Sequence, residues 1–117
     1  MITFLEKMMR KFQVAILGLK HIVKDSSILI QIVIGMVVLV VSVWLGLSKF
    51  DLMFVGVLIV LVIVCEIINT AIERLCDLYT TQVNPQVKYI KDLMAGCVLF
   101  VSVFALIMGL VIFIPYI

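Results

Sequence analysis

Four polar side chains in one largely apolar stretch carry residue types suited to phosphate or metal chemistry. Glu66, Asn69, Glu73 and Asp77 follow one another at intervals of three, four and four residues. At about 100° per residue, a helix turns all four toward one face, within an arc of about 80°. Oxygen ligands of this kind suit Mg²⁺, and a positioned carboxylate can also act as a general base. The spacing therefore marks a candidate site on one helical face.

The first two of these residues lie at a depth where the neighbouring sequence predicts a membrane. Glu66 and Asn69 end a long apolar run and are surrounded by aliphatic residues. An ionisable group at the centre of a membrane helix costs about 2.5–3.5 kcal/mol on insertion scales, so such a residue is a functional-site candidate. Glu73 and Asp77 follow one to three turns later, where the helix is expected to leave the membrane.

A second charged group begins the next predicted helix, after a short loop. Lys88, Lys91 and Asp92 lie there, and Lys91 can meet phosphate groups as a point charge. The chain has no GxxxxGK followed by Ser or Thr and no glycine-rich loop after a strand. Any phosphoryl transfer here is therefore not of the common soluble types.

The spacing alone leaves three interpretations open. The polar face fits catalysis, and it equally fits a transport or proton pathway. It also fits helix packing, in which Asn69 forms hydrogen bonds across a bundle while Lys88 and Lys91 extend toward the interface.

Composition places the chain in a membrane. Its 117 residues are 66% hydrophobic and only 14% charged, which excludes an ordinary soluble globule and favours a single membrane domain, 1–117. The three cysteines are expected to be free thiols, and no Cys/His spacing suggests zinc, so any metal site must use carboxylates. Nucleic acid is not an expected partner.

The elements predicted to position the site form an all-α integral membrane fold. An amphipathic surface helix is expected over about 4–24, followed by transmembrane helices at about 28–47, 52–79 and 85–115, the second including a cytoplasmic extension. Ser26 or Ser27 is expected to cap the first transmembrane helix, and Asn84 with Pro85 to start the last. Lys and Arg lie mainly before the first transmembrane helix and between the second and third. This distribution predicts a cytoplasmic N-terminus and second loop, with the C-terminus outside.

Two motifs in order resemble a known family. EIINTAIERLCDL, and KYIKDLMAG after a short loop, closely resemble the signature of the prokaryotic diacylglycerol kinases, whose Gram-positive members act largely as undecaprenol kinases. The resemblance runs from about Phe12 to the end and includes the Ala15, Gly18, Leu19 pattern and the closing GLVIFIPYI.

This resemblance implies a homotrimer in the bacterial inner membrane, with active sites between protomers at the cytoplasmic face. It implies transfer of the γ-phosphate of MgATP to a lipid hydroxyl, with undecaprenol the first choice of acceptor and diacylglycerol the second. Carried over by position, the catalytic residues are Glu66 as base and Asn69 beside it. The residues implied to contact nucleotide and metal are Glu73, Asp77, Lys91 and Asp92, with Glu73 binding magnesium.

One position departs from the family pattern. Counting from Gly18, Ser26 stands where the family has a glutamate that assists metal binding, and the neighbouring Asp25 is a weak candidate to replace it. Gln31 stands where many Gram-positive members have histidine. The alternative is therefore a catalytically degenerate member that acts as a non-catalytic membrane oligomer, with the polar face supporting its packing.

Overall fold

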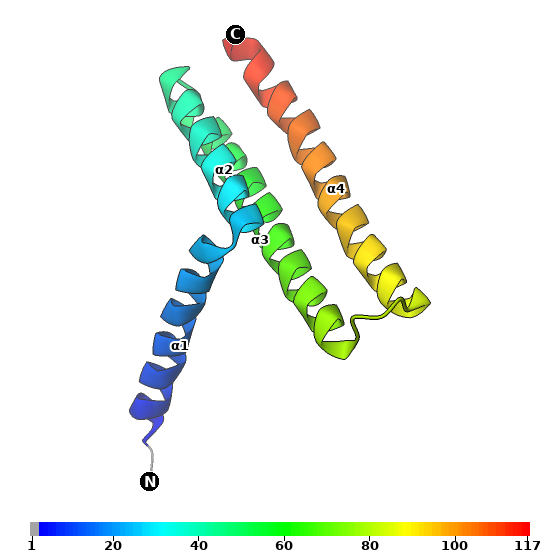
Figure 1. Ribbon diagram of the computed structural model, residues 1–117. Helices are drawn as coiled ribbons and strands as arrows, with labels where there is room; N and C mark the ends of the chain where they lie inside the picture. The colour runs from blue at the N-terminus through cyan, green and yellow to red at the C-terminus, as the bar shows by residue number, and fades with distance from the viewer. Residues whose placement is uncertain (1–2) are drawn as a thin grey trace.

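The computed structural model describes residues 3–117 as a chain of helices joined by short turns. In chain order they are α1 (Phe4–Lys24), α2 (Ser26–Trp44), α3 (Lys49–Tyr79), α4 (Pro85–Phe113) and the 3₁₀ turn η1 (Ile114–Tyr116). α2 and α3 form an antiparallel hairpin, α4 returns beside α3, and α1 leads away from the start of α2 (Figure 1).

Three of these helices have the length and composition needed to cross a membrane. They are α2, α3 and α4, the last continuing into η1. Their large aliphatic and aromatic side chains are mostly exposed, and few of the described residues are buried. Exposing so many apolar side chains to water would be unfavourable. The chain is therefore an all-α protein with three helices suited to a membrane.

The turn between α2 and α3 shifts two predicted boundaries. α2 ends at Trp44, three residues before the predicted end at 47, because Gly46 adopts a positive φ of 76° that an L residue rarely adopts. Ser48 then caps α3 by accepting a hydrogen bond from the Asp51 N–H, so α3 begins at Lys49 rather than near Leu52.

The caps of α2 and α4 show one wrong and one correct prediction. The side chain of Asp25, not of Ser26 or Ser27, caps α2 and accepts hydrogen bonds from the N–H groups of Ser27 and Ile28. An ionised carboxylate is favoured over a hydroxyl at the positive end of a helix. The prediction for α4 is confirmed, with Asn84 as the cap and Pro85 at the first position.

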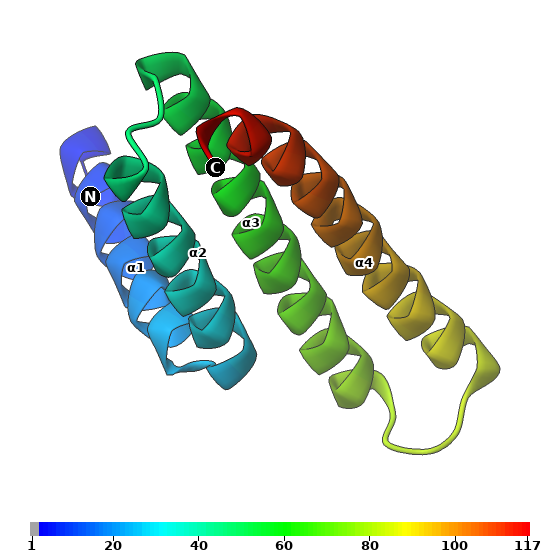
Figure 2. The ribbon, with the colours of Figure 1, turned by 90° about the horizontal axis from the view of Figure 1, so that it is seen from above.

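α3 lies between α2 and α4 and packs against both (Figure 2). Its approach to α2 depends on Gly35, where an added Cβ would lie 2.6 Å from Cγ2 of Ile59. No side chain fits at that distance without movement, so the glycine permits the close contact.

Contacts at three levels join α3 and its cap residue to α4 and η1. At the end near the α2–α3 turn, the Tyr116 hydroxyl donates to Asp51 and accepts from the Ser48 N–H. Further along, the Sγ atoms of Cys65 and Cys97 lie 3.6 Å apart, and both thiols are free as predicted. The third level is an ion pair close to the α3–α4 loop, at the candidate site.

Candidate functional site

The predicted polar residues occupy an open edge of α3 beside its contact with α4. Cys65, Asn69 and Cys76 are the buried residues in this half of α3, and Cys65 touches α4. On a regular helix, Glu66, Glu73 and Asp77 lie about 60–100° around the axis from that buried line. Glu66 is half-buried, whereas Glu73 and Asp77 are exposed. The three carboxylates therefore flank the α3–α4 contact, where a ligand can approach them.

Asn69 connects the buried contact to this edge. Its Nδ2 donates a hydrogen bond of 3.2 Å to Oε1 of Glu73, one turn along α3. Its Oδ1 is buried and has no hydrogen-bond partner within residues 3–117. A buried acceptor without a partner costs free energy, which a donor from a ligand or from a neighbouring protein chain can offset. Asn69 thus holds the Glu73 side chain and leaves one acceptor available.

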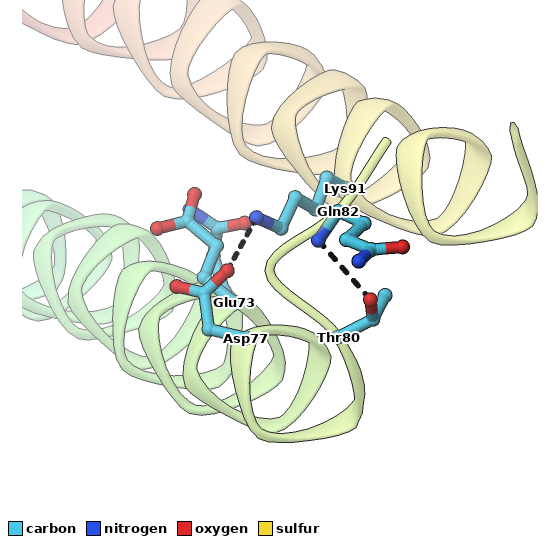
Figure 3. Close-up of polar contacts among 6 residues, drawn as sticks. Glu73, Asp77, Thr80, Gln82 and Lys91 are labelled. Atoms are coloured by element: carbon cyan, nitrogen blue, oxygen red, sulfur yellow. Dashed lines mark hydrogen bonds and ion pairs between the residues drawn. The ribbon is translucent and has the colours of Figure 1, made fainter. Parts of the chain in front are cut away.

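The second motif reaches the same edge through Lys91. Nζ of Lys91 on α4 lies 2.7 Å from Oδ1 of Asp77 on α3, across the loop between the two helices (Figure 3). Glu73 lies beside this pair in the same view. The loop is shaped in part by Thr80, whose hydroxyl accepts from the Gln82 N–H. The structure therefore brings Asn69, Glu73, Asp77 and Lys91 together.

Two other predicted site residues are less closely associated with this group. Glu66 has no hydrogen-bond or ion-pair partner among the described residues. Asp92 forms an exposed ion pair of 2.6 Å with Lys88, one turn earlier on α4. Glu66 precedes Glu73 by seven residues, about 10 Å along the helix axis, so the carboxylates lie at two clearly different depths.

Asp25 lies elsewhere. Its carboxylate caps α2, and it lines a cleft between α1, α2 and α3 to which Glu73 does not contribute. Hydrogen bonds from the Ile28 N–H and the Ser27 hydroxyl lower the pKa of Asp25, and the nearby Arg74 guanidinium lowers it further. Asp25 therefore has a structural role that the sequence reasoning missed, although aspartate before a helix is a common cap signal.

The carboxylates on the open edge fit a magnesium ion that takes only one or two ligands from the protein and the others from phosphates and water. Residues 3–117 contain no group of three or more His, Cys, Asp or Glu side chains placed to hold a metal. Mg²⁺ in phosphate-transfer sites commonly uses one or two carboxylates and takes its remaining ligands from phosphates and water. Glu73 and Asp77, one turn apart on the same edge, meet that smaller requirement.

An apolar groove lies on the side of Glu66 away from Glu73, and Ile63, three residues before Glu66, is its last lining residue on α3. The groove has a volume of about 340 Å³ and lies between α2, α3 and α4. Its α3 wall includes Ile59, Val62 and Ile63, which precede Glu66 by one to two turns. Gln31 and Ser102 add polar groups from α2 and α4. A hydrocarbon chain placed in this groove would end near the Glu66 carboxylate.

Comparison with known proteins finds sequence similarity over most of the chain. The family model described as prokaryotic diacylglycerol kinase matches residues 13–113. The undecaprenol kinase of Bacillus subtilis (strain 168) is 38% identical over 78 residues, which cover 67% of this chain and 63% of that relative. The matched part therefore spans less than two thirds of the relative's length. No solved structure matches this chain.

Proposed function

Because this chain belongs to the prokaryotic diacylglycerol kinase family, we propose that it is a lipid kinase that uses ATP. It transfers the γ-phosphate of ATP to the hydroxyl of a membrane lipid. Undecaprenol is the first candidate acceptor, since the relative described above is an undecaprenol kinase, and diacylglycerol is the second.

The observation that carries this proposal is the convergence of both family motifs on one edge of α3. The Lys91–Asp77 ion pair brings the start of α4 to the end of α3, next to Glu73 and its partner Asn69. The apolar groove approaches from the other direction, and its last α3 residue, Ile63, precedes Glu66 by about one turn. A lipid and a nucleotide can thus approach one edge from opposite ends.

The chemistry assigned to each residue follows from its depth. Glu66 accepts the proton of the lipid hydroxyl, since it is the half-buried carboxylate about one turn beyond Ile63, the last α3 residue of the groove. Lys91 exchanges its contact with Asp77 for one with the nucleotide phosphates, and Asp92 lies one residue further on α4. Asn69 positions Glu73.

Glu73 and Asp77 would hold magnesium, which would neutralise charge on the transferring phosphate. Asp25 remains a weak candidate for a further ligand. It lines a cleft that Glu73 does not line, and no group of three or more metal-ligand side chains among residues 3–117 brings the two together.

The proposal includes a homotrimer in the bacterial inner membrane. Each site would form between protomers, with the N-terminus and the α3–α4 loop in the cytoplasm and the C-terminus outside. α1 would lie in the membrane interface, because its apolar residues recur at helical spacing and its cationic residues fill the other side.

Transfer of labelled γ-phosphate tests the proposal. Purified protein is supplied with magnesium, ATP and either undecaprenol or diacylglycerol in mixed micelles. Product with either lipid supports the kinase, and the ratio of the products identifies the preferred acceptor. No product from a folded preparation would contradict it.

A second candidate function is a catalytically degenerate family member that acts as a membrane oligomer. It is favoured by Ser26 at the position of the family glutamate and by the use of Asp25 as a helix cap. Magnesium-dependent ATP binding separates the two candidates, because a packing role requires none.

A further inference from the structure

Two cysteines meet where α3 packs against α4, and the proposed phosphate transfer uses neither of them. The Sγ atoms of Cys65 and Cys97 lie 3.6 Å apart, and both thiols are free. Cys65 is 8% exposed and belongs to the buried line of α3, whereas Cys97 is exposed on α4. The two residues are 32 positions apart in the chain, so the packing of the two helices brings them together. An accessible thiol therefore lies beside a sheltered one.

The third cysteine provides a comparison at equal burial. Cys76 lies on the same helix as Cys65 and is 7% exposed. It follows Cys65 by eleven residues, which is about 16 Å along the helix axis. Burial on α3 thus does not by itself place a thiol beside Cys97, and Cys76 is a matched buried thiol away from the pair.

The contact between the two thiols suits a disulfide better than a zinc site. Structural zinc usually takes four ligands, and residues 3–117 contain no group of three or more His, Cys, Asp or Glu side chains placed to hold a metal. Two sulfur atoms 3.6 Å apart already touch, and side-chain rotation can supply the further approach that a covalent bond requires. An accessible thiol next to a second thiol is also the usual arrangement of a redox-sensitive pair.

The surroundings of Cys97 indicate the class of oxidant. α4 has no charged residue from Leu93 to the end of the chain, and α3 has none from Leu52 to Cys65. Cys97 is therefore exposed within the apolar part of a membrane helix, where an oxidant that dissolves in the membrane can reach it. We propose that an organic hydroperoxide oxidises Cys97 and that Cys65 converts the product into a disulfide between α3 and α4. This proposal does not depend on the kinase activity.

Two steps account for the atoms and electrons. Sγ of Cys97 attacks the terminal oxygen of the hydroperoxide, so that an S–O bond forms, the O–O bond breaks and the thiol proton leaves with the alkoxide as an alcohol. Sγ of Cys65 then attacks Sγ of Cys97. The S–S bond forms, the S–O bond breaks, and the Cys65 proton leaves with hydroxide as water. The two thiols together lose two electrons, which reduce the hydroperoxide to the alcohol and water.

The test treats the purified full chain in lipid vesicles with cumene hydroperoxide, alkylates the remaining thiols and maps the peptides without reductant. Peptides containing Cys65 and Cys97 should appear linked, and a dithiol reductant should separate them. Cys76 should remain alkylated. C76A should form the link at a rate within about twofold of the unaltered chain. Loss of the link in C76A, or a link from Cys97 to Cys76, would overturn the proposal.

Two variants test the separate roles of the paired thiols. In C65A, Cys97 should stop as a sulfenic acid that dimedone traps, because the second thiol is missing. In C97A, Cys65 should be oxidised at least about tenfold more slowly than in the unaltered chain, because it is buried. C97A changes an exposed side chain, so it keeps the proposal testable if C65A does not fold. Equal oxidation of Cys65 with and without Cys97 would contradict the proposal.

Two further measurements identify the oxidant and the partner of Cys97. Cumene hydroperoxide should form the link about tenfold faster than hydrogen peroxide at equal total concentration, because it enters the membrane and the exposed thiol lies there. An equal or faster reaction with hydrogen peroxide would overturn the membrane source. A disulfide between two chains as the main product would also overturn the proposal, because Cys97 would then react with its copy and not with Cys65.

Discussion

Lys91 and Asp77 form an ion pair of 2.7 Å that joins the two sequence motifs across the α3–α4 loop. The pair is partly exposed, so its contribution to the free energy of unfolding is small. Its larger consequence is positional, because it places a cation beside Glu73 before any nucleotide arrives.

Replacing Glu66 by Gln should lower lipid phosphorylation about 10²- to 10⁴-fold, because the side chain keeps its shape but can no longer accept a proton. ATP binding should be retained, since Glu66 lies about 10 Å along the axis from Glu73. The measurement is labelled phosphate transfer, with E6Q on α1 as the control. An active E66Q protein would remove Glu66 from the role of base.

Two lysines on α4 provide a matched pair. K91Q breaks the contact between helices with Asp77, whereas K88Q breaks only the exposed pair with Asp92 within α4. K91Q should raise the KM for ATP about tenfold or more, since it removes a charge-assisted phosphate contact. K88Q should leave that KM nearly unchanged. Similar KM values in the two variants would contradict the placement of nucleotide beside Lys91.

Replacing Asn69 by Leu should separate function from packing. The variant removes the buried Oδ1 that has no partner, so the unfolding temperature in micelles should stay the same or rise. Phosphate transfer should fall, because Glu73 loses its hydrogen bond. A packing role for Asn69 predicts the reverse, namely a lower unfolding temperature.

Asp25 should make stability depend on acidity. Hydrogen bonds to the start of α2 lower its pKa in the folded chain, so its stabilising effect is complete above the ordinary pKa of an aspartate. That effect is lost as the pH falls through the lowered pKa. D25N keeps a capping side chain that does not titrate, and its unfolding temperature should therefore fall less than that of the unaltered chain on acidification. If the unfolding temperatures of D25N and of the unaltered chain fall equally with pH, Asp25 does not have this role.

The sequence predicted the carboxylate edge well because that edge belongs to one helix. Glu66, Glu73 and Asp77 share a face through the helical period alone, and Asn84 with Pro85 signals the start of α4 in the same local way. A local signal can also mislead when adjacent residues are all suitable as a cap, as Asp25 and the two serines after it are at the start of α2.

Contacts between helices could not be predicted from the sequence. The burial of Asn69 depends on how α4 lies against α3, and the close approach at Gly35 depends on the crossing of α2 and α3. The cleft lined by Asp25 likewise requires the angle between α1 and α3, which no periodicity specifies.

The different depths of Glu66 and Glu73 also give the proposed reaction a direction. A neutral hydroxyl can remain near Glu66, where the surroundings are largely apolar. Once phosphorylated, the same lipid carries a charge that is costly at that depth. The charged product would therefore move outward toward water and leave the groove free for the next neutral acceptor. The apolar membrane interior would in this way favour release of product over its return to the site.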